Sequence, residues 1–339
     1  MILMKKVNVG IVGLGRVSQL AYLNNLVINK NINSLSVCDK NKDLLNKVSK
    51  KYKILKKYLN YEEMLKKESL DLVILVVNKF LVEEISQKIL NDKKSFILFT
   101  EKPFALSYEK AKKLVNVSSK KKKIHLVGYM KRCDGGISYL KNKLNSFKLG
   151  KITSVNYFSF DGNSFDPQKK YIKYFFNSKK KNYPILNYLN TQCHSINLLE
   201  YLFGKIKLEY SDLKKNGEGV VFFKNKEDIK IVLINKFNKF TNWFEKISIV
   251  YEKGIVNVNL PAPFYKNKKT IIKVKNFSNK KVFMPKLNNK NWSFTNQVNL
   301  IIEYAISKKI NKNIATKSEL CTTKNFLHEF KIIERIFKI

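Results

Sequence analysis

Short apolar runs alternate with amphipathic stretches through the first 128 residues of the chain. Val7–Val12 and Leu72–Val77 are two of these runs, and the second, LVILVV, is the most apolar in the sequence. Such a run is typical of a parallel strand covered on both faces. The other predicted strands are Leu35–Cys38, Phe96–Phe99 and His125–Val127, and the predicted helices are Ser18–Ile28, Leu44–Lys51, Tyr61–Lys67, Leu81–Leu90 and Ser107–Ser118. Regular alternation of strands and helices predicts an α/β domain with a doubly wound parallel sheet.

The pattern changes after Gly128. Further strand-like segments follow one another with few helices between them: Ile152–Phe160, Val220–Phe223, Ile229–Lys236, Glu245–Tyr251, Ile255–Leu260 and Thr270–Val274. The predicted helices are Ile137–Leu144, Cys193–Phe203, Phe294–Ser307 and Thr322–Phe337. Consecutive strands of this kind predict a large, open, mostly antiparallel sheet. We therefore expect two domains, residues 1–128 and residues 129–339, the second of the α+β class.

Residues 13–18 read GLGRVS and stand between the first predicted strand and the first predicted helix. This is a dinucleotide-binding fingerprint in which Ser18 replaces the third glycine. Gly13 permits a tight turn, and Gly15 lets the backbone approach a pyrophosphate. The helix that follows presents free backbone N–H groups to the anion. The motif gives four candidate cofactor-binding residues: Gly13, Gly15, Arg16 and Val17. An ordinary strand–turn–helix connection is the alternative interpretation.

Asp39 ends the second predicted strand, 21 positions after Ser18. A carboxylate at this place accepts hydrogen bonds from both ribose hydroxyls of NAD and repels the 2′-phosphate of NADP. Lys40 beside it offsets part of that repulsion. We therefore expect NAD as the cofactor and leave NADP open.

The net charge of the chain raises a different possibility. A formal charge of +40 over 339 residues suggests a nucleic-acid or anionic-membrane partner. However, only three of the 66 basic residues are arginines, the side chains that bind phosphates and guanines bidentately. The densest lysine runs, Lys120–Lys123 and Lys179–Lys181, lack interleaved aromatic residues for base stacking. We therefore expect solvated lysines from a compositional bias and no nucleic-acid partner.

Cysteines and termini bear on cellular location. The four cysteines share no CxxC spacing, and with the three histidines they form no metal-ligand pattern, so no metal is expected. Scattered thiols are typical of a reducing compartment. The N-terminal residues lack the order of a signal peptide, and no run of about 18 apolar residues occurs. We expect a cytoplasmic protein with no membrane partner.

Glu101, Lys102 and Pro103 follow the predicted strand Phe96–Phe99. Because ligands bind outside the carboxyl ends of parallel strands, we expect Lys102 to face the cofactor crevice. Together with VGIVGLGRVS, the segments EKPFALS, VGYMKR and TQCHSINLLEYLFG resemble the Gfo/Idh/MocA oxidoreductases. The resemblance covers nearly the whole chain and includes WFEKISIVYEKGIVNVNLPAP in the second half.

This resemblance implies a Rossmann domain that binds NAD(P) and an open-sheet domain through which homodimers or homotetramers form. It also implies hydride transfer between the nicotinamide and a carbon of a sugar, sugar nucleotide or cyclitol. Lys102 then lies at the oxygen of the reacting carbon, and His194 is the acid/base. The resemblance further places Asn78 and Glu101 at the cofactor and Tyr129, Arg132 and Asn190 at the substrate; for Arg132, a salt bridge at the domain junction is the alternative.

The implied roles suit the chemistry of these residues. Histidine titrates near neutrality and can take a hydroxyl proton while hydride leaves the same carbon. His194 stands near a predicted helix start, with Asn190 and Thr191 as candidate caps, and the helix dipole there favours the neutral imidazole. Lys102 can stabilise the developing alkoxide. His125 and His328 are interpreted as structural.

The sequence also departs from the family pattern. Asn190 and Asn197 stand where the family has aspartates, four residues before and three residues after the histidine. Val77–Lys79 and Val82 replace a Thr-Pro-Asn turn and a nearby histidine. Two alternatives therefore stay open: an NAD-dependent glycosidase or eliminase that oxidises its substrate transiently, and an inactive nucleotide-binding regulator. The presence of both Lys102 and His194 argues against the second.

Overall fold

The computed structural model describes residues 6–163, 185–186, 188–278, 282–287, 291–311 and 313–337. The chain divides into two compact units. Unit 1 comprises Met1–Met130 and Phe294–Leu327, and unit 2 comprises Lys131–Ser293 and His328–Ile339. The sequence predicts a single boundary at residue 128. The observed division differs from it, because Phe294–Leu327, near the C-terminus, belongs to the first unit.

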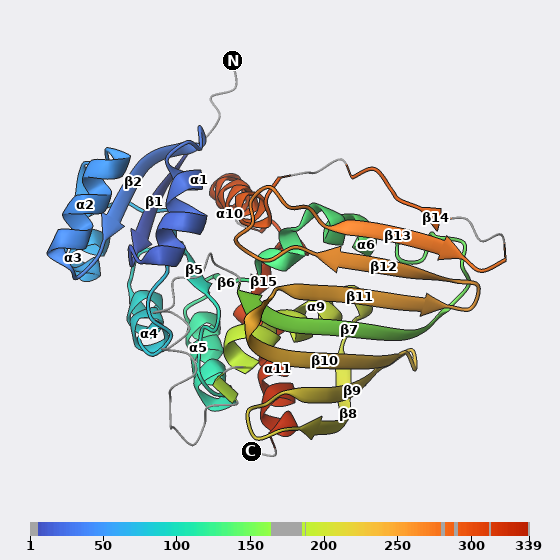
Figure 1. Ribbon diagram of the computed structural model, residues 1–339. Coiled ribbons are helices and arrows are strands. Elements are labelled where there is room, and N and C mark those ends of the chain that lie inside the picture. The colour runs from blue at the N-terminus through green and yellow to red at the C-terminus, as the bar shows by residue number, and fades with distance from the viewer. Residues whose placement is uncertain are drawn as a thin grey trace. The chain divides into compact units, whose positions relative to one another are not determined.

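Unit 1 contains a seven-stranded sheet with the order β15-β6-β5-β4-β1-β2-β3 (Figure 1). Its strands are β1 (Val7–Val12), β2 (Ile32–Cys38), β3 (Lys56–Tyr58), β4 (Leu72–Leu75), β5 (Ile97–Glu101), β6 (His125–Gly128) and β15 (Cys321–Thr322). All the pairs are parallel except that of β15 with β6. The predicted doubly wound parallel sheet is confirmed. The strand order reverses between β1 and β4, the point at which such sheets bind ligands.

The helices of unit 1 follow the predicted alternation. The first is a helical run over residues 16–26, which contains a π-helical turn, η1 (Ser18–Leu23), and the short α1 (Asn24–Leu26). The others are α2 (Lys42–Tyr52), α3 (Tyr61–Lys67), α4 (Val82–Asn91), α5 (Tyr108–Lys120) and α10 (Ser293–Ile310). Side-chain caps fix several starts. Ser107 caps α5, and its side chain accepts the N–H of Lys110 at 3.3 Å. Val9, Ile11 and Leu72 are fully buried, as expected for strands covered on both faces.

Unit 2 contains an eight-stranded sheet with the order β14-β13-β12-β11-β7-β10-β9-β8 (Figure 1). Its strands are β7 (Ile152–Asn163), β8 (Ile206–Leu213), β9 (Gly219–Asn225), β10 (Lys230–Asn242), β11 (Phe244–Tyr251), β12 (Gly254–Leu260), β13 (Ile271–Asn276) and β14 (Val282–Phe283). β7 and β10 are parallel, and the other pairs are antiparallel. The predicted mostly antiparallel sheet is therefore confirmed.

The helices of unit 2 include one that lies in its core. These elements are η2 (Met130–Cys133), α6 (Gly135–Lys143), η3 (Tyr188–Gln192), α9 (Cys193–Phe203) and α11 (Thr323–Ile336), the last of which begins in unit 1. Apart from Glu200, every residue of α9 is buried, which is typical of a helix surrounded by protein. α9 ends at Gly204, whose φ of 79° suits a glycine.

The start of α9 differs from the expectation. A π-helical turn, η3, runs directly into α9, and Gln192 at the junction has helical backbone angles and no side-chain cap bond. Asn190 and Thr191 lie inside that turn. Their predicted role as caps is therefore wrong, because the helical backbone already continues through them. His194 lies one turn into a longer helical segment, where the dipole effect on its imidazole is weaker than at a free N-terminus.

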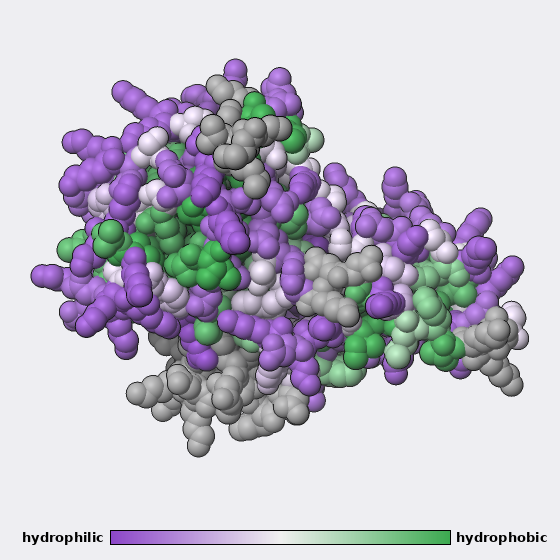
Figure 2. All heavy atoms as spheres, turned by 90° about the horizontal axis from the view of Figure 1, so that it is seen from above, coloured by the Kyte–Doolittle hydropathy of each residue, from purple (hydrophilic) through white to green (hydrophobic). Residues whose placement is uncertain are grey.

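The surface matches the scattered lysines of the sequence. On the face in Figure 2, hydrophilic side chains are spread across the described residues and are interrupted by smaller hydrophobic patches. In the described part of the chain, no helix combines the length and apolar character needed to cross a membrane.

Candidate functional site

The glycine-rich turn after β1 has the geometry of a phosphate-binding loop. Gly13 has a φ of 90°, and a Cβ atom there would lie 2.3 Å from the carbonyl oxygen of Val76, so only glycine fits. A Cβ atom on Gly15 would meet no other heavy atom within 4 Å. The backbone at Gly15 therefore faces open space that a ligand can approach closely, as the fingerprint requires.

The helix after this turn completes the cradle. Its first residues, Arg16 and Val17, are half-buried, and the N–H of Gln19 bonds to the carbonyl of Gly15 at 3.1 Å. In general, the first amides of a helix have no carbonyl within the helix to accept their protons. Ser18, which replaces the third glycine of the fingerprint, is fully buried, and the fingerprint requires a small residue there for close helix–strand packing. These residues fit the pyrophosphate of a dinucleotide.

Asp39 is held against the turn by two backbone hydrogen bonds. Its Oδ2 accepts the N–H of Leu14 at 2.8 Å, and its Oδ1 accepts the N–H of Asn41 at 2.9 Å. The carboxylate is half-buried and keeps lone pairs that can accept further hydrogen bonds. The structure thus brings the predicted ribose-binding residue to the predicted phosphate loop. The residues present fit NAD.

Glu101 and Lys102 lie at the carboxyl end of β5. The carboxyl group of Glu101 accepts the hydroxyl proton of Tyr22 and, at 3.1 Å, the backbone N–H of Lys102. Burial raises the pKa of Glu101, although the Lys102 charge and the Tyr22 hydrogen bond act in the opposite direction. Tyr22 lies on η1, so this contact ties the phosphate-binding helix to the residue that precedes Lys102. No sequence motif indicates this role for Tyr22.

A residue from α10 extends this contact. Because the Tyr22 hydroxyl donates its proton to Glu101, it can only accept from Gln297, whose amide nitrogen lies 3.2 Å away. The amide oxygen of Gln297 then accepts the N–H groups of Tyr129 and Met130, each at 3.1 Å. A helix near the C-terminus therefore fixes both the end of β6 and the Tyr22–Glu101 contact within unit 1.

The loop after β4 adds a second lysine beside Lys102. Asn78, a predicted cofactor-binding residue, is exposed, and its side chain accepts the N–H of Phe80 at 3.0 Å. Lys79 is half-buried, and its pKa is lowered by burial and then by the positive charge of Lys102. Asn78 thus stabilises the turn, and the amine of Lys79 lies within electrostatic range of Lys102.

In unit 2, hydrogen bonds surround the buried His194. Ser195, the next residue, donates its hydroxyl proton to the Oγ of Ser159 at 3.1 Å and also lies 3.2 Å from Oε1 of Gln192. The amide nitrogen of Gln192 contacts Oδ2 of Asp161 at 3.5 Å. These bonds fix the first turn of α9 to β7 and thereby position the backbone of His194, which is 9% exposed.

A buried ion pair lies in the same unit and was not predicted. Lys131 and Glu245 are 5% and 2% exposed, and their charged groups lie 2.5 Å apart. The Glu245 carboxylate also accepts the Tyr157 hydroxyl and, at 3.1 Å, the indole N–H of Trp243. The Lys131 amine lies 5.3 Å from the centroid of the Trp243 ring.

The three predicted substrate-binding residues lie in different surroundings. Tyr129, in unit 1, is 1% exposed and stacks on Phe326 with ring centroids 4.9 Å apart. The guanidinium of Arg132, in unit 2, lies 4.5 Å from the ring centroid of Tyr201. Asn190 is half-buried in η3. Lys102 belongs to unit 1 and His194 belongs to unit 2. The catalytic roles expected for these two residues stay predictions.

The other two histidines have structural contacts, in agreement with their interpretation. His125, on β6, lies 3.0 Å from Oγ1 of Thr100, and burial lowers its pKa to about 3. Nδ1 of His328 lies 2.6 Å from Oε1 of Glu200. Within the described residues, no three His, Cys, Asp or Glu side chains are grouped to hold a metal ion.

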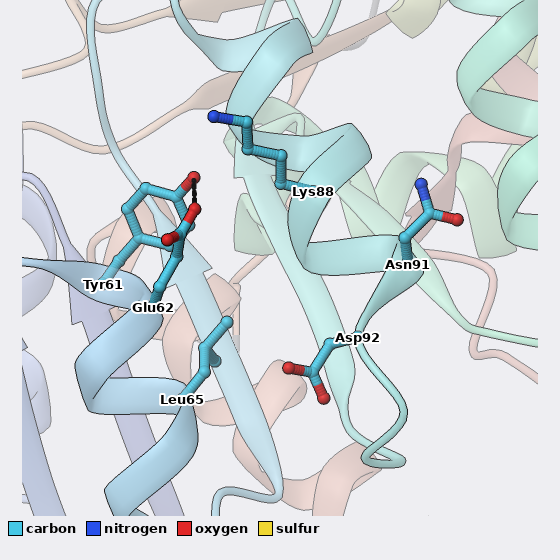
Figure 3. Close-up of a pocket in the computed structure, with 6 residues that line it drawn as sticks. All are labelled: Tyr61, Glu62, Leu65, Lys88, Asn91 and Asp92. Atoms are coloured by element: carbon cyan, nitrogen blue, oxygen red, sulfur yellow. Dashed lines mark hydrogen bonds between the residues drawn. The ribbon is translucent and has the colours of Figure 1, made fainter.

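A surface pocket of about 350 Å³ lies between α3 and α4 (Figure 3). It is lined by Tyr61, Glu62, Leu65, Lys88, Asn91 and Asp92. The hydroxyl of Tyr61 donates a hydrogen bond to Oε1 of the adjacent Glu62 at 3.2 Å. The pocket contains none of the predicted site residues, so it is separate from the phosphate loop.

Comparison with known proteins agrees with this geometry. Residues 7–129 match the sequence model of the Gfo/Idh/MocA oxidoreductase family, which has an NAD-binding Rossmann fold. Over these residues the chain is similar to that family. The Gfo/Idh/MocA match contains every residue of the phosphate loop, Asp39 and the Glu101–Lys102 pair. A comparison with curated proteins found no match.

Solved structures share the two-unit fold of this chain. A dehydrogenase from Clostridium difficile has a TM-score of 0.76 at 18% identity, covering 98% of this chain and 99% of its own. An apo scyllo-inositol dehydrogenase from Lactobacillus casei has a TM-score of 0.72 at 17% identity, covering 99% and 96%. A 3-ketoreductase from Actinomadura kijaniata, crystallised with NADP and TDP-benzene, has a TM-score of 0.77 at 12% identity, covering 98% of each chain.

Proposed function

We propose that this protein transfers a hydride between NAD(P) and a CH–OH carbon of a sugar, sugar nucleotide or cyclitol. The observation that carries the proposal is the phosphate loop of a matched oxidoreductase family, with Asp39 anchored against it. Two proteins of the same fold support the substrate class by analogy, a scyllo-inositol dehydrogenase and a 3-ketoreductase crystallised with TDP-benzene.

In this proposal, the bound cofactor supplies the hydride acceptor or donor. Lys102 donates a hydrogen bond to the substrate oxygen and stabilises negative charge that develops there. The imidazole of His194 takes the hydroxyl proton during oxidation and returns it during reduction. Tyr129, Arg132 and Asn190 are proposed to contact the remaining hydroxyl or anionic groups of the substrate.

The proposed activity is tested with the purified chain, NAD and NADP, and a panel of sugars, sugar nucleotides and cyclitols. We expect stoichiometric reduction of the nicotinamide with at least one of these classes, followed by its absorbance. Cofactor that stays bound and unreduced while a substrate bond is cleaved would instead indicate transient oxidation. Binding of the cofactor without any turnover across the panel would contradict the proposal.

Replacing Asp39 with alanine is expected to change the choice of cofactor. The variant loses the carboxylate proposed to accept the ribose hydroxyls and to repel a 2′-phosphate, so NAD should bind about 10-fold or more weakly while NADP loses less. Dissociation constants for both cofactors measure this shift. Asp39→Asn is the matched control, because it keeps an acceptor for the Leu14 N–H and removes the charge. An unchanged ratio of the two constants in both variants would exclude the ribose role.

We also propose that the chain forms a homodimer or homotetramer through one face of the eight-stranded sheet. On that face, side chains at alternating positions are apolar and partly exposed. The register places Phe158 beside Ile234 and Phe160 beside Phe244, and Phe222 beside Val232. The rings of Phe160 and Phe244 are 5.5 Å apart. An apolar patch of this kind is typical of an interface between copies of a chain.

A paired substitution on this face tests the assembly. We expect the wild type to elute with a mass two or four times 39.7 kDa, and Phe158→Lys with Ile234→Lys to elute as a monomer. Light scattering after size-exclusion chromatography measures both masses. Val282→Lys, on the edge strand β14, is the control, because Val282 is exposed and apolar but lies outside the patch. A monomeric wild type would contradict the proposal.

The proposed location is the cytoplasm. All four cysteines, Cys38, Cys133, Cys193 and Cys321, are free and buried. Free thiols support a reducing compartment.

A further inference from the structure

Lys79 and Lys102 leave the same edge of the unit 1 sheet from neighbouring strands. Leu75, the last residue of β4, pairs in parallel with Thr100 of β5, so the loops that follow the two strands begin side by side. Lys79 is four residues beyond the end of β4, and Lys102 directly follows β5. The positive charge of Lys102 acts on the amine of Lys79, which is also partly removed from water. Two ammonium groups therefore share this part of the site.

The strand order shows which half of a dinucleotide they face. The sheet has two mononucleotide-binding halves, β1 to β3 and β4 to β6. The phosphate loop and Asp39 belong to the first half, which takes the adenosine ribose. The nicotinamide half of a bound cofactor would therefore lie over the carboxyl ends of β4 and β5, the ends from which both lysines leave.

Charge on the nicotinamide distinguishes the two redox states of the cofactor. The ring is positively charged when oxidised and neutral when reduced, whereas the phosphates carry the same charge in both states. A nearby ammonium group therefore repels only the oxidised ring. The ammonium group attracts the phosphates equally in both redox states. This attraction therefore does not change the ratio of the oxidised to the reduced dissociation constant.

Glu101, the acidic residue before Lys102, is engaged by two other groups. It is half-buried, and it bonds to the hydroxyl of Tyr22 and to the backbone of Lys102. Burial raises its pKa and so disfavours the carboxylate.

We propose that Lys79 is a redox-discriminating residue that makes the site bind reduced nicotinamide more tightly than oxidised nicotinamide. The inference rests on the proposed function, because it needs a nicotinamide cofactor. It favours alcohol oxidation on the protein: the substrate C–H bond breaks with its electron pair, and the hydride neutralises the nicotinamide ring. The hydroxyl proton passes to His194 as the C=O bond forms.

The test compares dissociation constants of NAD⁺, NADH, NADP⁺ and NADPH by calorimetric titration. Lys79→Met is expected to lower the ratio of the oxidised to the reduced constant by about three- to tenfold. Lys79→Arg keeps the charge and should keep the ratio. Lys88→Met is the matched control, because Lys88 is an exposed lysine of α4 that pairs with Glu84 at 3.2 Å.

Two results would overturn the proposal: an unchanged ratio in Lys79→Met, or an equal weakening of both redox states, which would place Lys79 at the phosphates. Thermal unfolding checks that each variant is folded, and Lys79→Gln provides a second neutral variant if Lys79→Met is destabilised. If the wild type binds none of the four cofactors, the proposed function itself fails. If it binds them and turns over substrate while the ratio is unaffected by Lys79, only the redox role fails.

Discussion

Replacing Lys102 with alanine is expected to reduce kcat for hydride transfer by about 100- to 1,000-fold. The reason is that the ammonium group is proposed to stabilise negative charge on the substrate oxygen, which is greatest in the transition state. NAD should still bind, because the phosphate loop and Asp39 hold the adenosine half through residues of β1 and β2. Stopped-flow nicotinamide absorbance gives the rate, and calorimetry gives cofactor affinity.

Matched variants separate the role of Lys102 from a general effect of charge. Lys88→Ala removes one positive charge from the exposed side of α4 and should leave kcat unchanged. Lys102→Arg keeps the charge but changes the shape of the donor, so it should restore only part of the rate. If Lys102→Ala turns over at the wild-type rate, or if only KM rises, the assignment of Lys102 to the reacting oxygen is wrong.

The largest expected loss of stability comes from Glu245. Glu245→Ala should lower the free energy of unfolding of unit 2 by about 3–5 kcal/mol. The substitution leaves the amine of Lys131 buried without its carboxylate, and it also removes the acceptor for the Tyr157 hydroxyl and the Trp243 indole. Urea unfolding followed by the fluorescence of tryptophan, including Trp243, measures the change.

A double variant tests whether the buried charge is the cause. Lys131→Met combined with Glu245→Leu removes both charges, and it should recover most of the stability that Glu245→Ala loses. The exposed pair Lys88–Glu84 provides the contrast, because Glu84→Gln should cost less than about 1 kcal/mol. A loss below about 1 kcal/mol for Glu245→Ala would show that water reaches the pair.

Elements with a strong periodic pattern could be predicted from the sequence. β1 and α3 have the expected bounds, because their apolar residues repeat at the spacing of a buried strand and of an amphipathic helix. β3 was missed because its three residues, Lys56–Tyr58, carry no apolar pattern and take their strand geometry from pairing with β2. β8 was also missed, although Ile206, Leu208 and Tyr210 alternate with charged residues as in a half-buried strand.

The candidate site could be predicted where a local motif sets the geometry. The turn at Gly13 and Gly15 and the acid at Asp39 are such residues, since the fingerprint fixes their spacing. Tyr22 contacts Glu101 across 79 positions, and Tyr157 contacts Glu245 across 88. No periodic signal connects residues so far apart, so only the folded sheets bring them together. The π-helical turn before α9 was likewise hidden, because Asn190 and Thr191 resemble helix caps in sequence.

Titration of the purified wild-type chain with NAD⁺ and NADH, and with their phosphorylated forms, is the most direct measurement. We predict saturable binding of one dinucleotide per chain by at least one of the four, and competition by ADP-ribose, which carries the pyrophosphate and the adenosine ribose without the nicotinamide. Absence of binding by all four would show that the loop at residues 13–18 and Asp39 do not form a cofactor site, and the proposed hydride transfer would be excluded.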